Sequence, residues 1–123
     1  MAPSEGPEGA LWMLQARMGF QFADQAILRQ ALVHRSLVNE VDMSRADSNE
    51  RMEFLGDAVL GLVTTEMLYQ RHPDYDEGLL SRIRSSLVNR NAAASFAKAL
   101  DLGSCLQVAA GAEKTGARQR SSV

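Results

Sequence analysis

The sequence predicts an all-α domain, and three observations lead to this fold class. Apolar residues recur with helical spacing in several segments, the clearest of which start at Leu11, Ile27, Met52 and Leu79. No segment alternates apolar and polar residues as a half-buried strand does, and no internal repeat is present. A chain of 123 residues with 46% hydrophobic content has the size of one domain, able to bury about two-thirds of the surface that its unfolded form exposes.

Two short helices are expected near the N-terminus. Residues 1–7 contain two prolines and a glycine without periodicity, which predicts a disordered leader. A first helix then runs from Glu8 to a stop at Gly19. A second helix begins after the N-cap Asp24 and ends around His34.

A long helix is expected in the middle of the chain. Residues 39–48 are polar and acidic and predict a loop. Ser48 or Asn49 can cap a helix that begins at Glu50 and runs to about Arg71, and Pro73 stops it.

Helical spacing resumes after a turn at residues 73–78. Apolar residues repeat from Leu79 to Val88, which predicts a fourth helix. After residue 91 the pattern returns and reaches Leu100, either as a continuation or as a separate helix. From Gly103 onward the composition shifts to Gly, Ser, Ala, Arg and Gln, and no amphipathic segment of useful length follows.

The cysteine content and the N-terminal residues bear on the cellular compartment of the protein. The single cysteine, Cys105, has no intramolecular partner, and the first residues lack the basic-then-apolar order of a signal peptide, so the sequence indicates a cytoplasmic protein. No apolar run approaches the ~20 residues that span a bilayer, so no membrane contact is expected.

The charge is unevenly distributed. Residues 1–77 hold 6 basic and 13 acidic side chains, a net −7, whereas residues 78–123 hold 7 basic and 2 acidic ones, a net +5. The basic part is a candidate for polyanion binding, and an aromatic content of 6% favours a duplex backbone over stacked single-stranded bases. The candidate cations are Arg82, Arg84, Arg90, Lys98, Lys114, Arg118 and Arg120.

Three carboxylates stand out within the long helix. At 100° per residue, Glu50, Glu53 and Asp57 fall within roughly 60° of one another and form one acidic stripe. At ~6 Å and an effective dielectric constant of ~20, each neighbouring pair repels by roughly 3 kcal/mol, which a bound cation would offset. Carboxylates without nearby His or Cys favour Mg²⁺ or Mn²⁺, so the stripe suggests a divalent metal site.

The alternative is that the stripe is a solvated face neutralised by Arg45, Arg51 or a distant arginine. Apolar residues surround the helix on nearly all sides, which instead predicts a core helix with little ordinary wet surface. Residue chemistry leaves both interpretations open and favours a metal or catalytic role. The surrounding apolar residues are Met52, Phe54, Leu55, Val59, Leu60, Leu62 and Val63.

The segment Asn49-Glu-Arg-Met-Glu-Phe-Leu-Gly-Asp57 resembles the signature helix of the ribonuclease III family, metal-dependent endonucleases that cut double-stranded RNA. The resemblance extends outward in register. It includes Ala31-Leu-Val-His-Arg-Ser36, Asp76-Glu-Gly78, Ser81-Arg-Ile-Arg84 and Leu87-Val-Asn-Arg-Asn91, and the stretch from Gly103 to Arg120 with Glu113-Lys-Thr-Gly116. It implies the helical bundle of the family's endonuclease domain.

The resemblance also implies roles for single residues. Glu53 would be a catalytic Mg²⁺ ligand, and Asp57 the essential carboxylate that positions metal and attacking water; Glu50 and Glu77 would be supporting acids. Hydrolysis would leave 5′-phosphate and 3′-hydroxyl ends in RNA processing, including that of ribosomal RNA. RNA contacts are expected from Arg82, Arg84, Arg118 and Arg120.

Family members work as homodimers whose signature helices meet across a two-fold axis. Phe54 would then lie in the dimer interface. The alternative is that Phe54 is an intramolecular core residue. Neither His34 nor His72 is expected in catalysis, because neither follows a Glu by three residues or precedes an Asp; His34 is expected to cap or pack at a helix end.

The family pattern continues beyond Val123 with a helix bearing Asp-x-x-Glu and, in bacterial members, a double-stranded-RNA-binding domain. Residues 8–123 are therefore expected to be a partial catalytic domain, incomplete at its C-terminus and without the RNA-binding domain. We expect impaired activity and uncovered apolar surface on the signature and fourth helices, which makes the chain poorly stable, aggregation-prone or partner-dependent. The alternatives are a fragment of a nuclease, a split nuclease completed by another chain, a non-catalytic dimerisation or RNA-binding module, and a small scaffold that binds a protein partner.

Overall fold

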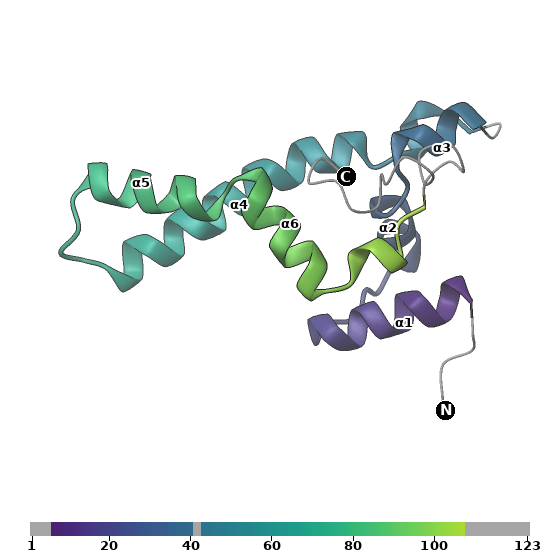
Figure 1. Cartoon of the computed structure of the whole chain (residues 1–123), viewed down its shortest axis with the longest axis horizontal. Coiled ribbons are helices and arrows are strands. Elements are labelled where there is room, and N and C mark those ends of the chain that lie inside the picture. Colours follow the sequence, from purple (N-terminus) through teal and green to yellow (C-terminus); the bar gives the residue numbers. More distant parts are fainter. Residues whose placement is uncertain (1–5, 41–42, 108–123) are drawn as a thin grey trace.

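The chain forms an all-α structure, as the sequence predicts (Figure 1). The computed structural model describes residues 6–40 and 43–107. Within these ranges there is no strand, and only one isolated bridge, between Val33 and Gln107, pairs extended backbone. The helices are α1 (Pro7–Met18), α2 (Gln25–Ala31), α3 (Arg35–Glu40), α4 (Glu50–Arg71), α5 (Glu77–Leu87) and α6 (Arg90–Ala99), with the 3-10 helices η1 (Arg45–Asp47) and η2 (Leu102–Ser104).

The first helix begins and ends close to its predicted limits. Pro7 occupies its first turn, where a missing N–H is not needed. Gly19 ends α1 in the left-handed region (φ 67°), and its N–H donates to the carbonyl of Ala16. Residues 1–5 of the expected leader lie outside the described residues, and Pro7 already belongs to the helix.

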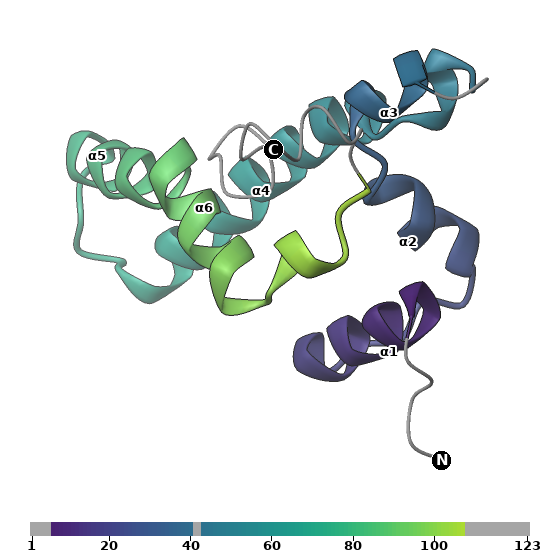
Figure 2. The same cartoon turned by 45° about the vertical axis from the view of Figure 1, so that its right-hand side comes forward.

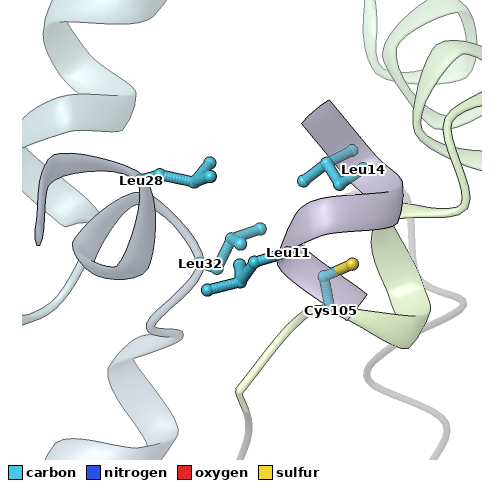
Figure 3. Close-up of a cluster of buried hydrophobic side chains, with 5 residues drawn as sticks. All are labelled: Leu11, Leu14, Leu28, Leu32 and Cys105. Carbon is cyan, nitrogen blue, oxygen red and sulfur yellow. The ribbon is translucent and has the colours of Figure 1, made fainter. Parts of the chain in front are cut away.

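The hydrophobic core lies between α1, α2 and the segment that follows α6 (Figure 3). Leucine side chains from α1 and from the α2 region point toward one another, and Cys105 closes the cluster. Leu14 is only 1% exposed, and burial of such a side chain stabilises the fold by about 1.5–3 kcal/mol. The core members are Leu11, Leu14, Leu28, Leu32 and Cys105.

The second helix is shorter than predicted. Asp24 caps it as expected, with its Oδ1 accepting from the Ala26 N–H, but α2 ends at Ala31 rather than near His34. The backbone of residues 32–34 instead binds a distant segment: Gln107 N–H donates to the Leu32 carbonyl at 2.8 Å, and His34 N–H donates to the Gln107 carbonyl at 2.9 Å.

The described part of the loop expected at residues 39–48 contains helical structure. The six-residue α3 follows directly after His34, and η1 lies within the segment predicted to be irregular. Ser44 and Asp47 form a reciprocal capping box that stabilises η1. Helical turns this short carry too little periodicity to be visible in the sequence.

The long helix α4 has the predicted bounds. Of the two predicted caps, Ser48 supplies the hydrogen bond, since its Oγ accepts from the Glu50 N–H at 3.4 Å. The side chain of Asn49 makes no cap bond and donates instead to the Ala31 carbonyl at 3.0 Å. After α4 ends, His72 stacks on Tyr75 with ring centroids 4.5 Å apart.

The structure shows whether the pattern after residue 91 continues the fourth helix or forms a separate one. The helix α5 returns alongside the C-terminal half of α4 (Figure 1), and Arg84 donates to the Thr65 hydroxyl across this pair. The chain then breaks at Val88, and Asn89 caps a separate helix, α6, by accepting from the Ala92 N–H at 2.8 Å. Figure 2 shows α6 running back from α5 toward the side of the molecule where α1 lies.

The prediction that α4 is a core helix is wrong for the described structure. Only Thr64 and Leu68 of α4 are buried, whereas Phe54, Leu55 and Leu62 are 85%, 63% and 68% exposed. The expected uncovered apolar surface is present on α4 but not on α5, whose leucines are half-buried. In the described ranges, no helix has the length and apolar character needed to cross a membrane.

Candidate active site

A cavity of about 630 Å³ lies beside the N-terminal half of α4. Three parts of the chain form its walls: the junction of α2 and α3, the first turns of α4, and the junction of α5 and α6. The lining residues are His34, Arg35, Asn49, Glu50, Glu53, Gly56, Asp57, Leu60, Val88, Asn89, Arg90 and Ala93.

Backbone hydrogen bonds hold the first two walls together. The Asn49 N–H donates to the Val33 carbonyl at 2.9 Å, which places the residue before α4 next to the residue before His34. The bonds between residues 32–34 and Gln107 hold the same junction from the other side. Fixed backbone at this point determines where His34 and Arg35 lie relative to the acids of α4.

The predicted acidic stripe is brought together in this cavity. Glu50, Glu53 and Asp57 all line it, and all three are exposed. Glu50 has an ion pair with Arg35, in which Nη1 and Oε1 are 3.9 Å apart and both side chains are largely exposed, so the pair contributes little stability. Within the described residues, no ion pair joins Arg45 or Arg51 to these acids.

The imidazole of His34 also lines the cavity. Its Nδ1 lies 2.8 Å from the Ser36 hydroxyl and accepts from the Ser36 N–H at 3.2 Å, so His34 caps the start of α3 rather than the end of the second helix. Burial and then the neighbouring Arg35 charge lower the pKa of His34, while Glu53 and Glu50 oppose this shift. A neutral ring that accepts at Nδ1 carries its proton on Nε2.

A smaller cavity of about 290 Å³ adjoins the first. It shares His34, Arg35 and Glu50 with the larger cavity. Arg45, which does not line the larger cavity, adds its guanidinium to the smaller one. The polar residues therefore continue from the acidic cavity toward α3 and η1.

Several predicted site residues lie elsewhere. Glu77 lines neither cavity, and its Oε1 accepts from the Ser81 hydroxyl at 2.8 Å at the start of α5. Arg82 and Arg84 also lie outside both cavities. His72, for which no catalytic role was expected, lines neither cavity and stacks on Tyr75. Arg118 and Arg120 lie outside the described residues.

Phe54 is an exposed residue in the N-terminal half of α4. By helical position Leu62 and Leu55 lie about 80° and 100° to one side of it. Glu50 and Asp57 lie about 40° and 60° to the other side, so Phe54 borders the acidic stripe. Phe54 is 85% exposed in the described structure, which favours the interface role over the core role.

Arg35 and Asn89 are cavity residues that the sequence did not single out, and Arg90 was named only among the candidate cations for polyanion binding. A signal for them was nevertheless present. The segments at residues 31–36, 49–57 and 87–91 carried the resemblance to a nuclease family, and these are the segments that provide the cavity walls.

The fold and the site together define a class of protein: a helical domain with an open cavity lined by carboxylates on one helix face. Comparison with known families places this chain within that class, because the profile of the Ribonuclease-III-like family matches residues 24–123. The chain belongs to the Ribonuclease-III-like family.

Curated relatives support the same assignment. The chain is 44% identical to a Ribonuclease 3 from Syntrophobacter fumaroxidans over 100% of its own length and 49% of that protein. It is 46% identical to a Ribonuclease 3 from Methylococcus capsulatus over 89% of its length and 45% of that protein. The chain thus spans about half the length of these relatives.

Solved structures show the same fold. The nuclease domain of ribonuclease III from Campylobacter jejuni, solved at 2.2 Å, matches with a TM-score of 0.81 and 35% identity, covering 91% of this chain and 72% of that one. A second structure of that domain, described for flexibility in a region involved in dimer formation, matches with a TM-score of 0.80, 35% identity, and coverage of 89% and 73%.

Proposed function

We propose that this chain provides the catalytic domain of a double-stranded-RNA-specific endoribonuclease. The observation that carries the proposal is that Glu50, Glu53 and Asp57 line one open cavity whose walls come from three of the segments that resemble the family. Hydrolysis of the phosphodiester would give 5′-phosphate and 3′-hydroxyl ends. We assign the activity to processing of RNA, including ribosomal RNA, in the cytoplasm, where Cys105 would stay reduced.

The donor set suits a hydrated Mg²⁺ ion, with Mn²⁺ as a substitute. Every carboxylate in the cavity offers hard oxygen ligands, and no cysteine lines it. Among the described residues no three metal-binding side chains converge closely enough to form a ligand group. Glu53 and Asp57 would therefore hold an ion that keeps several of its waters.

When bound, such an ion lowers the pKa of an attacking water and offsets charge on the attacking and leaving oxygens. The carboxylates of this chain do the positioning. Glu53 and Asp57 accept hydrogen bonds from water and so orient it toward the phosphorus. Glu50 lies at the edge of the same cavity, where it also pairs with Arg35.

The exposed apolar residues of α4 support a homodimer, with Phe54 in the interface. Many large apolar side chains exposed along a single helix are a common mark of a protein interface. The second Campylobacter jejuni structure, which concerns a region involved in dimer formation, agrees with this assignment.

We further propose that residues 8–123 constitute a partial catalytic domain that cuts slowly alone. The lack of a converged three-donor group among the described residues is the basis for this expectation. The same observation, combined with the exposed face of α4, favours one second candidate: a non-catalytic dimerisation or RNA-binding module.

Cleavage of a labelled RNA duplex in Mg²⁺, in Mn²⁺ and in EDTA tests the proposal. Asp57→Asn should reduce the metal-dependent rate by at least about 100-fold, the order of contribution expected of one catalytic group. Glu66→Gln is the matched control, since Glu66 is an exposed carboxylate of α4 that does not line the cavity. Equal rates for wild type and Asp57→Asn, or duplex binding without any cutting, would favour the non-catalytic module.

A further inference from the structure

Two arginines from different helices border the acidic cavity. Arg35 is the first residue of α3, and Arg90 is the first residue of α6. Figures 1 and 2 show α3 near the N-terminal end of α4 and α6 farther along it, so the two helices approach the cavity from separate places. Arg35 was not among the cations expected to bind RNA, whereas Arg90 was one of the seven candidate cations for polyanion binding.

Neither guanidinium is held firmly by the rest of the described chain. Arg35 makes one long ion pair of 3.9 Å with Glu50, and its side chain is 72% exposed. Arg90 is exposed and has no hydrogen bond or ion pair with the described residues. Both groups therefore keep most of their N–H donors available.

By contrast, the two amide side chains that line the cavity are engaged in hydrogen bonds within the protein. Asn49 Nδ2 donates to the Ala31 carbonyl, and Asn89 Nδ2 donates to the carbonyls of Ser85 and Ser86. Asn89 Oδ1 accepts from the Ala92 N–H. These hydrogen bonds hold the cavity walls in place. The N–H groups of the two arginines are therefore the main cationic side-chain donors that remain available to a ligand.

The negative charge of the cavity suggests a role for the two arginines. A phosphodiester entering this cavity meets three carboxylates, which repel it. Two guanidinium groups at the border offset part of that repulsion, and their planar N–H pairs match the two non-bridging oxygens of a phosphate.

We propose that Arg35 and Arg90 form a phosphate clamp that binds backbone phosphates of the RNA duplex and holds the strand over the acidic cavity. This proposal rests on the proposed function, because it names the groups that bind the same substrate. The clamp differs from Arg82 and Arg84, which line neither cavity.

Binding of a fluorescein-labelled RNA duplex, followed by anisotropy in EDTA at several NaCl concentrations, tests the clamp. EDTA prevents metal-dependent cutting, so the binding measured is an equilibrium. Each lost phosphate contact reduces the slope of log K against log salt by about 0.9. Arg35→Gln and Arg90→Gln should each produce this change and weaken binding about tenfold at low salt.

Arg71→Gln is the matched control, because Arg71 is an exposed arginine at the other end of α4 and lines neither cavity. Its slope and affinity should equal those of wild type. Arg90→Lys keeps the charge, so it should retain the salt slope while losing part of the affinity. Circular dichroism of each variant verifies that the helices are intact.

The clamp is overturned if Arg35→Gln and Arg90→Gln behave like Arg71→Gln, or if wild type has no measurable affinity for the duplex. Its failure is distinguishable from that of the nuclease proposal. Duplex binding that depends on both arginines, together with no metal-dependent cutting, supports the clamp and contradicts the nuclease. Cutting that depends on Asp57 but not on either arginine supports the nuclease and contradicts the clamp.

Discussion

The backbone N–H of Asn49 donates to the carbonyl of Val33 at 2.9 Å, which fixes the start of α4 against the end of the α2 region. The Asn49 side chain reinforces this junction by donating to the Ala31 carbonyl at 3.0 Å. Two walls of the acidic cavity meet here, because Asn49, His34 and Arg35 all line it.

Asn49→Ala should therefore lower the free energy of unfolding by about 1 kcal/mol, the typical net contribution of one such hydrogen bond. Urea unfolding measures the change. Asn91→Ala serves as the control, since Asn91 is exposed on α6 and lines neither cavity. An equal effect of the two substitutions would contradict a special role for the Asn49 junction.

Leu14→Ala should destabilise the chain by about 2–5 kcal/mol, because it empties a site in the core that is 1% exposed. Thermal unfolding followed by circular dichroism measures the loss. Ile27→Ala, which truncates a side chain of α2 that is 49% exposed, should have a much smaller effect. Comparable losses would mean that the core does not lie between α1 and α2.

Phe54→Glu should convert a homodimer to a monomer without loss of helix content, since Phe54 is 85% exposed within one chain. Sedimentation equilibrium gives the mass, and circular dichroism gives the helix content. Phe96→Glu, a change at a 52% exposed residue of α6, should leave the mass unchanged. Unfolding of the Phe54 variant would instead indicate a core role.

Stability should fall as the pH drops below about 6.5, the pKa of histidine in an unfolded chain. Burial and Arg35 lower the pKa of His34 in the folded state, against the opposing charges of Glu53 and Glu50. The unfolded chain therefore binds more protons than the folded chain in this range, so protonation favours unfolding. The loss continues until the pH passes below the lowered folded-state pKa.

Urea unfolding in EDTA between about pH 5 and 8 measures this dependence around the histidine pKa. His34→Asn should flatten the profile, because asparagine can still accept the Ser36 N–H as a cap but does not titrate. His72→Asn is the control, as His72 stacks on Tyr75 outside both cavities. An unaltered profile for His34→Asn would assign the dependence to other groups.

Local signals explain what the sequence predicted well. The bounds of α4 follow from a polar cap at Ser48 and from Pro73, and the acidic stripe follows from helical spacing alone. These features depend on residues within a few positions of one another, so no knowledge of the rest of the fold is needed.

Long-range contacts explain what the sequence did not predict. The early end of α2 depends on backbone bonds from Gln107, and the presence of Arg90 in the cavity depends on the turn between α5 and α6. Apolar residues on nearly all sides of α4 predicted a buried helix, but periodicity does not reveal whether the covering surface belongs to the same chain.

Glu53 and Asp57 share a cavity in which we expect them to hold a divalent cation, and Mn²⁺ binding measured by electron paramagnetic resonance tests this role. Changes around a metal ligand already weaken affinity about 10–100-fold, so Glu53→Gln and Asp57→Asn should each weaken Mn²⁺ binding at least about tenfold, with Glu66→Gln unchanged. Equal Mn²⁺ affinity in all four proteins, or no Mn²⁺ binding by wild type, would mean that these two carboxylates do not hold a metal ion.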